Sequence, residues 1–176
     1  IRDSPLDKLE MIVLGGTVLE YPREYLTYFT TQIFYICNVY PFIDSRPMLS
    51  LEEEQNINMN ADIRIIGYTL ETRPDGIDHE SIHYLRSLGV TRMQIGIQHT
   101  NNELLKIVNR GHTVEDSIRA LKLLKDSGIK VICHLMPDLP YATKEQDIEM
   151  FNRILNDPDL VFDEGKIYPM VATDYT

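Results

Sequence analysis

Five apolar, strand-like runs divide this chain of 176 residues, and each run ends in polar or glycine residues. The runs are Leu9–Thr17, Ile63–Pro74, Arg92–Thr100, Lys130–Asp138 and Lys166–Thr173. Parallel strands that are buried on both faces read as near-continuous apolar sequence, so polar side chains within them are costly unless they are paired. At the carboxyl ends of barrel strands, by contrast, polar side chains face a ligand site. The pattern therefore predicts a site built from the ends of several parallel strands.

Helical patterns separate the five runs. Their expected first residues or caps are Pro22, Pro47, Asp78, Asn101 or Asn102, Thr113 and Thr143. Proline, Asp, Asn and Thr at these positions are typical of helix starts. Strands that alternate with helices predict an α/β fold with a mostly parallel sheet.

Two parallel architectures fit this order, a Rossmann sheet and a partial (β/α) barrel. The Rossmann fold needs a Gly-x-Gly-x-x-Gly turn after its first strand, whereas Gly15-Gly16-Thr17 is followed by Val18 and Leu19. Polar residues also end every run rather than only two neighbouring runs. The sequence therefore favours a partial, TIM-like barrel.

The composition limits the class of protein. A hydrophobic content of 43% suits one globular domain, and we expect residues 1–176 to be a single-domain segment of a longer protein. The net charge of −10 argues against a broad, non-specific nucleic-acid-binding surface. No apolar stretch approaches the roughly 20 residues that span a bilayer, so we expect no membrane association. Cys37 and Cys133 form no Cys-x-x-Cys pair, which indicates two reduced thiols in a cytoplasmic protein rather than a zinc or cluster site.

The first two strand ends offer different groups to a ligand. Gly15-Gly16-Thr17 exposes backbone amides and carbonyls, although an ordinary tight turn would explain it as well. Glu71 could accept hydrogen bonds from hydroxyl or amine groups, and Arg73 could hold a carboxylate or phosphate. The alternative is a structural ion pair, for example between Glu71 and Arg73 themselves.

The remaining strand ends carry an amide, an imidazole, an ammonium and a phenol. Gln98 can hydrogen-bond a polar ligand in two directions, and His134 can orient a ligand or move a proton, unless it is simply a satisfied core residue. Lys166 and Tyr168 alternate with Ile167 and so share one face of their strand. If that face points inward, both side chains reach the barrel interior; if it points outward, they are surface residues.

A zinc-protease pattern, His-Glu-x-x-His, occurs at His79, Glu80 and His83. On a helix the two imidazoles would lie one turn apart, with the glutamate as the base. The apolar face of that helix is formed by other residues, however, and no third ligand is evident. An exposed first helical turn explains the pattern better than a zinc hydrolase does.

Several stretches at these strand ends resemble the radical S-adenosylmethionine (SAM) domain of the Elongator catalytic subunit family, which carboxymethylates tRNA uridine. They are DKLEMIVLGGT (7–17), YPREY (21–25), TLETRPDGI (69–77), the long stretch from 89 to 140 that contains NRGHTVED and HLMPDLP, and KIYPMVAT (166–173). The resemblance covers nearly the whole chain, and its long middle stretch is highly specific.

This resemblance implies a partial (β/α) barrel that holds SAM and a 4Fe–4S cluster. Reductive cleavage of SAM would give a 5′-deoxyadenosyl radical, which activates acetyl-CoA for addition at C5 of the wobble uridine in tRNA. The implied contacts are Gly15, Gly16, Thr17, Glu71, Gln98 and His134 for SAM, Lys8 for acetyl-CoA, Lys166 and Tyr168 near the substrate, and Arg73 and Arg110 for anions. Other Elongator-type subunits are implied partners.

Two parts of the family pattern are missing from this sequence. The first strand of the barrel and the loop with the three cluster cysteines would precede Ile1, and neither Cys37 nor Cys133 replaces those cysteines. The acetyltransferase-like domain that follows the barrel is also absent. We therefore expect this segment to be inactive in isolation, with no metal ligands of its own. A non-catalytic barrel that serves as an assembly or binding module is the alternative.

Overall fold

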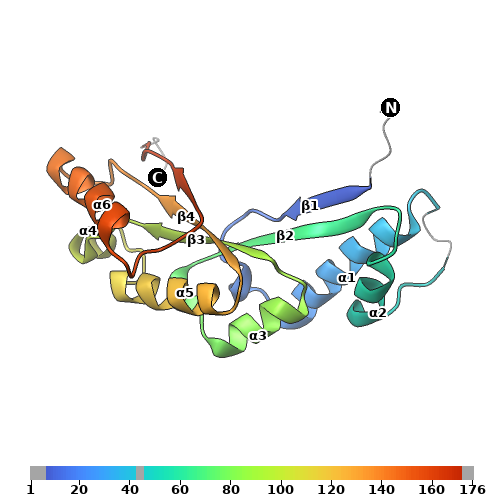
Figure 1. Cartoon of the computed structure of the whole chain (residues 1–176). Coiled ribbons are helices and arrows are strands. Elements are labelled where there is room, and N and C mark those ends of the chain that lie inside the picture. Colours follow the sequence, from blue (N-terminus) through green and yellow to red (C-terminus); the bar gives the residue numbers. More distant parts are fainter. Residues whose placement is uncertain (1–6, 43–45, 172–176) are drawn as a thin grey trace.

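The computed structural model describes residues 7–42 and 46–171, and in them one parallel sheet forms the framework (Figure 1). Its strands are β1 (Lys8–Ile12), β2 (Arg64–Thr72), β3 (Arg92–Gln98), β4 (Lys130–Leu135) and β5 (Glu164–Ile167). They lie in the order β1-β2-β3-β4-β5, so each strand pairs in parallel with its neighbour along the chain. The sheet curves into an open half-barrel, which confirms the predicted α/β class and partial barrel.

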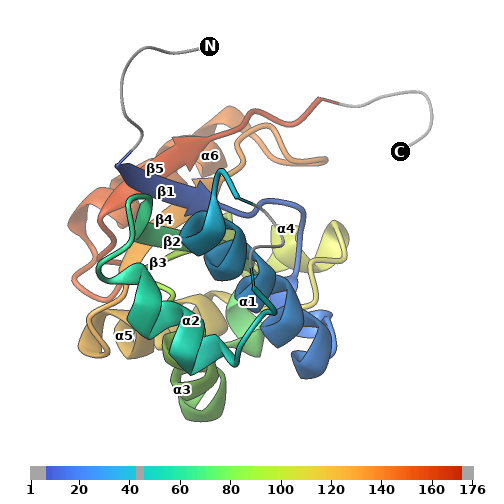
Figure 2. The same ribbon diagram turned by 90° about the vertical axis from the view of Figure 1, so that its right-hand side faces the viewer.

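Helices connect the strands. They are α1 (Arg23–Val39), α2 (Leu51–Asn58), α3 (His79–Ser87), α4 (Asn102–Ile107), α5 (Val114–Asp126) and α6 (Lys144–Asn156), with short 3-10 helices η1 (Val18–Glu20) and η2 (Pro74–Gly76). Figures 1 and 2 show α1, α2, α3 and α5 together on the convex side of the sheet. The concave side carries no helix in either view.

The helix starts follow the local capping chemistry. Asp78, Thr113 and Thr143 each accept a hydrogen bond from the third residue of their helix, as the sequence predicts, and Asn101 caps α4. The prediction for α2 was wrong. This helix begins after Ser50 rather than at Pro47, because Ser50 and Glu53 form a reciprocal capping box.

The hydrophobic core lies between the sheet and the convex helices. From β3, Met93, Ile95 and Ile97 point into it and are completely buried. The helices contribute residues of the same kind: Leu85, Leu88, Leu121 and Leu124. Because successive strand residues point to opposite faces, the residues between these apolar ones must face the concave side.

The last strand differs from its predicted range. It spans Glu164–Ile167 rather than Lys166–Thr173, and Thr173 lies outside the described residues. Pro169 has no N–H to give to a strand ladder, which ends the regular pairing. Single hydrogen bonds continue beyond it, from the N–H of Tyr168 to Leu135 and from the N–H of Met170 to Pro137, so this segment still follows the end of β4.

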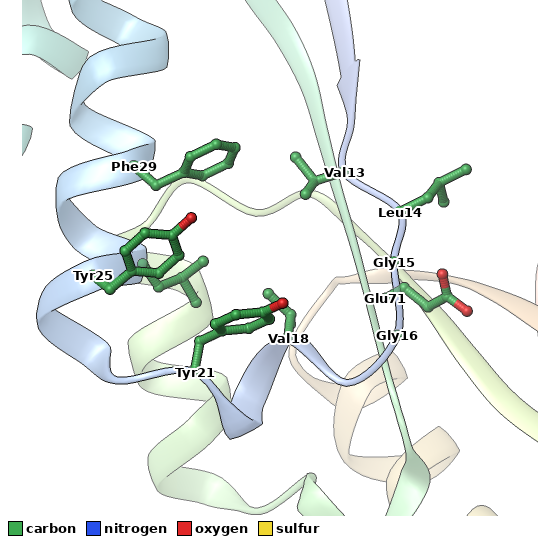
Figure 3. A pocket seen from close by; sticks show the side chains of 10 residues that line it. Val13, Leu14, Gly15, Gly16, Val18, Tyr21, Tyr25, Phe29 and Glu71 are labelled. Atoms are coloured by element: carbon green, nitrogen blue, oxygen red, sulfur yellow. The ribbon is translucent and has the colours of Figure 1, made fainter.

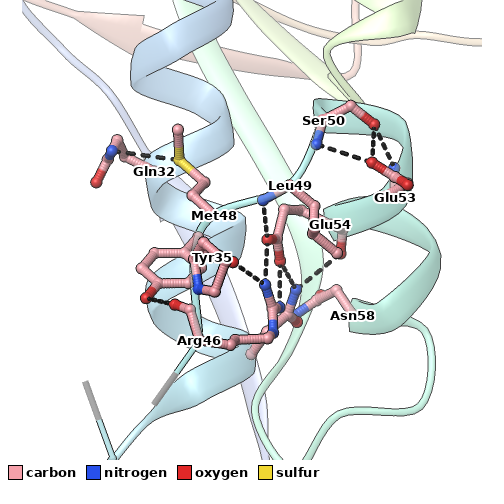
Figure 4. A network of polar contacts seen from close by, with 11 residues as sticks. Gln32, Tyr35, Arg46, Met48, Leu49, Ser50, Glu53, Glu54 and Asn58 are labelled. Atoms are coloured by element: carbon pink, nitrogen blue, oxygen red, sulfur yellow. Dashed lines mark hydrogen bonds and ion pairs between the residues drawn. The ribbon is translucent and has the colours of Figure 1, made fainter. Parts of the chain in front are cut away.

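A buried ion pair ties the segment before α2 to helix α1 (Figure 4). The side chain of Glu54 is completely buried and accepts two hydrogen bonds of 2.7 Å from the guanidinium of Arg46. Asn38 of α1 and the N–H of Leu49 also donate to Glu54. The bond from Arg46 is the main reason that the pKa of Glu54 falls to about 2.

Two further observations concern the cysteines and the helices. Cys37 and Cys133 are free and buried, and burial raises the pKa of both thiols. None of the helices in the described part of the chain has the length and apolar character needed to cross a membrane.

Candidate functional site

Four neighbouring strands bring four polar side chains together on the concave face. In the sheet register, Glu71 of β2 lies beside Gln94 of β3, and His134 of β4 lies beside Lys166 of β5. Lys166 thus faces inward, as one of the two sequence alternatives required. Tyr168 follows β5 on the same side, and its ring meets that of His134 edge to face, with centroids 5.3 Å apart. We call Glu71, Gln94, His134, Lys166 and Tyr168 the concave cluster.

Two hydrogen bonds and one close contact connect four members of this cluster in one line. The Nζ atom of Lys166 donates to Oε1 of Gln94 over 3.0 Å, and the same oxygen lies 2.6 Å from Nε2 of His134. On its other side, Nδ1 of His134 lies 3.4 Å from Oε1 of Glu71. A carboxylate, an imidazole, an amide and an ammonium therefore follow one another across four strands.

The environment of His134 favours its neutral form. Burial lowers its pKa below the ordinary value; the nearby carboxylate of Glu71 raises it and the ammonium of Lys166 lowers it further. Near neutral pH the ring is therefore an uncharged donor and acceptor, which can orient a polar ligand or carry a proton.

Gln98 lies beyond the cluster, where β3 bends. Its backbone has a φ of 70°, and the pairing of β3 with β4 is irregular between Ile95 and Gln98. Gly96 makes room for its side chain, because a Cβ at that position would lie 2.8 Å from Nε2 of Gln98 and 3.2 Å from Nη2 of Arg110. The amide of Gln98 and the guanidinium of Arg110 thus both lie over Gly96.

Arg73 and Arg110 are neighbouring cations in different environments. Arg73 forms a structural ion pair, as the alternative expected, but its partner is Asp75 rather than Glu71. The Nε atom of Arg110 is buried and has no hydrogen-bond partner in the described structure. Burial, followed by the charge of Arg73, lowers the pKa of Arg110. A cation with such incomplete pairing suits an anionic ligand group.

The Gly15–Gly16 turn borders a pocket between β1 and α1 (Figure 3). Both glycines have positive φ angles, 136° and 103°, and no described residue beyond their chain neighbours has an atom within 4 Å of where a Cβ would stand. The rings of Tyr21 and Tyr25 line one side with their centroids 5.6 Å apart, and Glu71 lies near the glycines. Thr17 follows directly and leads into η1 without making a side-chain cap. The turn is thus open for backbone contacts to a small ligand.

Lys8 lies apart from the other predicted site residues. It is exposed at the start of β1 and pairs in register with Arg64, at the opposite end of the sheet from the concave cluster. At about 3.3 Å per residue, the seven residues from Arg64 to Glu71 place it roughly 20 Å away from the cluster. Its predicted role with acetyl-CoA stays a prediction.

The zinc-like pattern on α3 has no metal-site geometry. His79, Glu80 and His83 are exposed, and Glu80 pairs with Arg23 over 2.7 Å. Among residues 7–42 and 46–171, no group of three or more His, Cys, Asp or Glu side chains could hold a metal ion.

Gln94 is the cluster member that the sequence did not reveal. It lies within an apolar run, and only its position between Met93 and Ile95 distinguishes it. Counting alternate residues back from Gln98 through Gly96 would have placed it on the concave face.

The sequence profile of the radical SAM superfamily matches residues 8–154. Among curated proteins, a tRNA uridine(34) acetyltransferase of Methanocaldococcus infernus is 42% identical over 172 residues, which cover 98% of this chain and 31% of that protein. Human Elongator complex protein 3 is 36% identical over 167 residues, covering 95% of this chain and 29% of its own length. The chain thus spans about a third of the curated relatives it matches.

Solved structures give the same picture. The archaeal Elp3 of Methanocaldococcus infernus with an N-terminal deletion matches with a TM-score of 0.90 and 42% identity, over 98% of this chain and 39% of that one. Coproporphyrinogen III oxidase of Escherichia coli, a radical SAM enzyme, matches with a TM-score of 0.54 over 68% of this chain and 27% of its own. At 20% identity, the second likeness concerns the fold alone.

Proposed function

Because this chain belongs to the radical SAM superfamily, as a radical SAM domain of the Elp3 and tRNA uridine(34) acetyltransferase family, we propose that it binds SAM within a tRNA-modifying enzyme. In this proposal the whole enzyme uses acetyl-CoA to build a carboxymethyl group at C5 of the wobble uridine. The chain would act in the cytoplasm, with tRNA and Elongator-type subunits as partners.

The observation that carries the proposal is the gathering of polar strand ends on the concave face. SAM has an amino acid part, a ribose and an adenine, so it needs acceptors, donors and an open backbone turn. The Gly15–Gly16 turn has free space, Glu71 offers a carboxylate, and Arg110 has an orphaned buried N–H. Bound to a reduced 4Fe–4S cluster, SAM supplies a carbon-centred radical.

We assign the residues by what they can offer. Gly15, Gly16 and Thr17 would bind through their backbone, while Glu71, Gln98 and His134 would orient polar groups of SAM. Lys166 and Tyr168 would lie on the substrate side of the concave cluster, where an ammonium and a phenol can hold or move a proton. Arg73 and Arg110 would contact anionic groups, and Lys8 would contact acetyl-CoA from the far end of the sheet.

The iron–sulfur cluster does not fit the described residues. They contain no group of three ligating side chains, and the two cysteines are buried in separate elements. We therefore propose that the cluster ligands lie outside this segment and that the isolated chain does not cleave SAM.

A chimera tests the proposal, because 42% identity and a TM-score of 0.90 allow this segment to replace its counterpart in the Methanocaldococcus infernus relative. The reconstituted chimera should release 5′-deoxyadenosine from SAM. Glu71→Gln should lower that release at least about tenfold, since one charged hydrogen bond contributes roughly 1.5–3 kcal/mol. Glu80→Gln on exposed α3 is the matched control and should have no effect.

A folded chimera that holds its cluster but cleaves no SAM would contradict the proposal. It would favour the alternative, in which this barrel is a non-catalytic assembly or binding module. Equal activity of the Glu71→Gln and Glu80→Gln variants would remove Glu71 from the site while leaving the function in place.

A further inference from the structure

Gln94 occupies an unusual position for an amide. Its side chain is completely buried in the middle of β3, and it faces the concave side between Glu71 and Lys166. Its Oε1 atom has two partners, Nε2 of His134 and Nζ of Lys166. Its Nε2 atom is buried and has no hydrogen-bond partner among the residues that the structure describes.

The chemistry of the partners fixes the orientation of this amide. An ammonium group has only donors, so the Gln94 atom that faces Lys166 must be the oxygen. That oxygen can only accept, so the His134 nitrogen 2.6 Å away must carry a hydrogen. In the neutral ring the other nitrogen, Nδ1, is then an acceptor, and it lies beside the carboxylate of Glu71.

We propose that Gln94 is a positioning residue of this site, which holds His134 in the Nε2–H tautomer and directs the ammonium of Lys166 toward the concave face. The result is two adjacent acceptors, Nδ1 of His134 and the Glu71 carboxylate, ready for a donor group of the bound molecule. The hydrogen on Nε2 follows from the hydrogen bonds, and the free Nδ1 follows from the neutral ring; only the identity of the bound molecule rests on the proposed function.

A purely structural role for Gln94 fits the structure less well. A methionine would fill a similar volume without leaving a buried N–H₂ group unpaired, whereas the glutamine leaves that group unsatisfied. The benefit of the amide lies instead in its oxygen, which gives an imidazole and an ammonium one common partner.

The experiment is long-range proton–nitrogen NMR of the whole chain with ¹⁵N-labelled histidine, with His134 assigned by its loss in His134→Gln. At a pH where the ring is neutral, His134 of the native chain should show the Nε2–H pattern. Gln94→Met should turn this into a mixture of both tautomers, with a melting temperature within about 4 °C of the native value. Gln55→Met, which removes an amide bonded to Ser87 from α2, should leave the His134 signals unchanged.

A second variant keeps the test decisive if the first one does not fold. Gln94→Glu would place a second carboxylate beside His134, in addition to Glu71 from β2 and against Lys166 from β5, with Tyr168 unchanged. The pKa of His134 should then rise by about one unit or more, since a nearby negative charge favours the imidazolium. The same substitution should leave the NMR signals of the exposed His79 and His83 unchanged.

An Nδ1–H tautomer in the native chain would overturn the inference, and so would a native pattern that persists in Gln94→Met. Neither NMR measurement needs SAM, a 4Fe–4S cluster or tRNA. A chain that passes this test but forms an inactive chimera would therefore refute the proposed function and leave the role of Gln94 intact.

Discussion

At the scale of single residues, the concave face depends on what is absent as much as on what is present. Gly96 has no side chain, and for this reason Gln98 and Arg110 can both reach over β3. The sequence shows Gly96 within an apolar run but gives no sign of this role. Only the bend of the strand and the arrival of Arg110 from the loop after α4 reveal it.

Gly96→Ala should separate function from stability. The added methyl group would meet the ends of two long side chains, which can rotate away, so we expect the free energy of unfolding to change by less than about 1 kcal/mol. Displacement of Gln98 and Arg110 should nevertheless lower SAM cleavage by the chimera at least about tenfold, measured as 5′-deoxyadenosine release. Gly76→Ala, where a Cβ would make an ordinary 3.4 Å contact with Leu19, is the control. Equal activity of both variants would show that neither displaced side chain contacts the ligand.

At the scale of elements, local sequence rules predicted most boundaries and failed where a longer-range contact decides. The caps at Asp78, Thr113 and Thr143 act within four residues, so the sequence suffices for them. The start of α2 is different. Glu54 holds Arg46 and Leu49 in place, and this leaves Pro47 in the connecting segment rather than in the helix.

Glu54→Gln should weaken this connection and change its pH dependence. The pKa of Glu54 is lowered in the folded chain to about 2, so its contribution to stability is complete above about pH 4.5 and disappears as the pH falls toward 2. A shift of this size corresponds to about 3 kcal/mol at pH 7. Urea unfolding should show this difference between the native chain and the variant at pH 7, and a smaller one at pH 3.

Glu52→Gln is the control on the same helix, because Glu52 is exposed. The Glu52→Gln variant should unfold at the same urea concentration as the native chain at both pH 7 and pH 3. The free energies of unfolding of the native chain and Glu54→Gln could instead differ by the same amount at pH 7 and pH 3. That result would mean that the charge of Glu54 does not contribute to stability.

At the scale of the whole molecule, three buried histidines link stability to pH. His99, His112 and His134 all have lowered pKa values, with burial as the first cause in each case. As the pH falls through about 6.5, these histidines therefore bind protons in the unfolded chain but not yet in the folded chain. Stability is complete above that pH and falls as the pH decreases toward the folded values.

Urea unfolding at pH 7.5, 6.5 and 5.5 measures this effect. Each histidine contributes at most about 1.4 kcal/mol per pH unit within its window. His112→Asn should reduce the slope, whereas the double variant of the exposed His79 and His83 to glutamine should keep it. A stability that does not change between pH 7.5 and 5.5 would contradict the burial of all three rings.

The sequence predicted the overall architecture better than the details of the site. Alternation of strands and helices predicted the parallel sheet, and the polar ends of every run favoured the half-barrel over a Rossmann sheet. Four strand ends were found through Glu71, Gln98, His134 and Lys166, but not the connection between them. Gln94 was not predicted, because a single amide inside an apolar run does not indicate a site. Only the strand register places it beside Glu71.

The sequential order of the strands also has a consequence for how the chain folds. Each new strand adds to a sheet edge that its predecessor has formed, so the half-barrel can grow from β1 to β5 during synthesis. Gln94 is in place two strands before Lys166 arrives. The docking of β5 is therefore the step that completes the polar line, and an intermediate without it would resemble the fold while lacking the site.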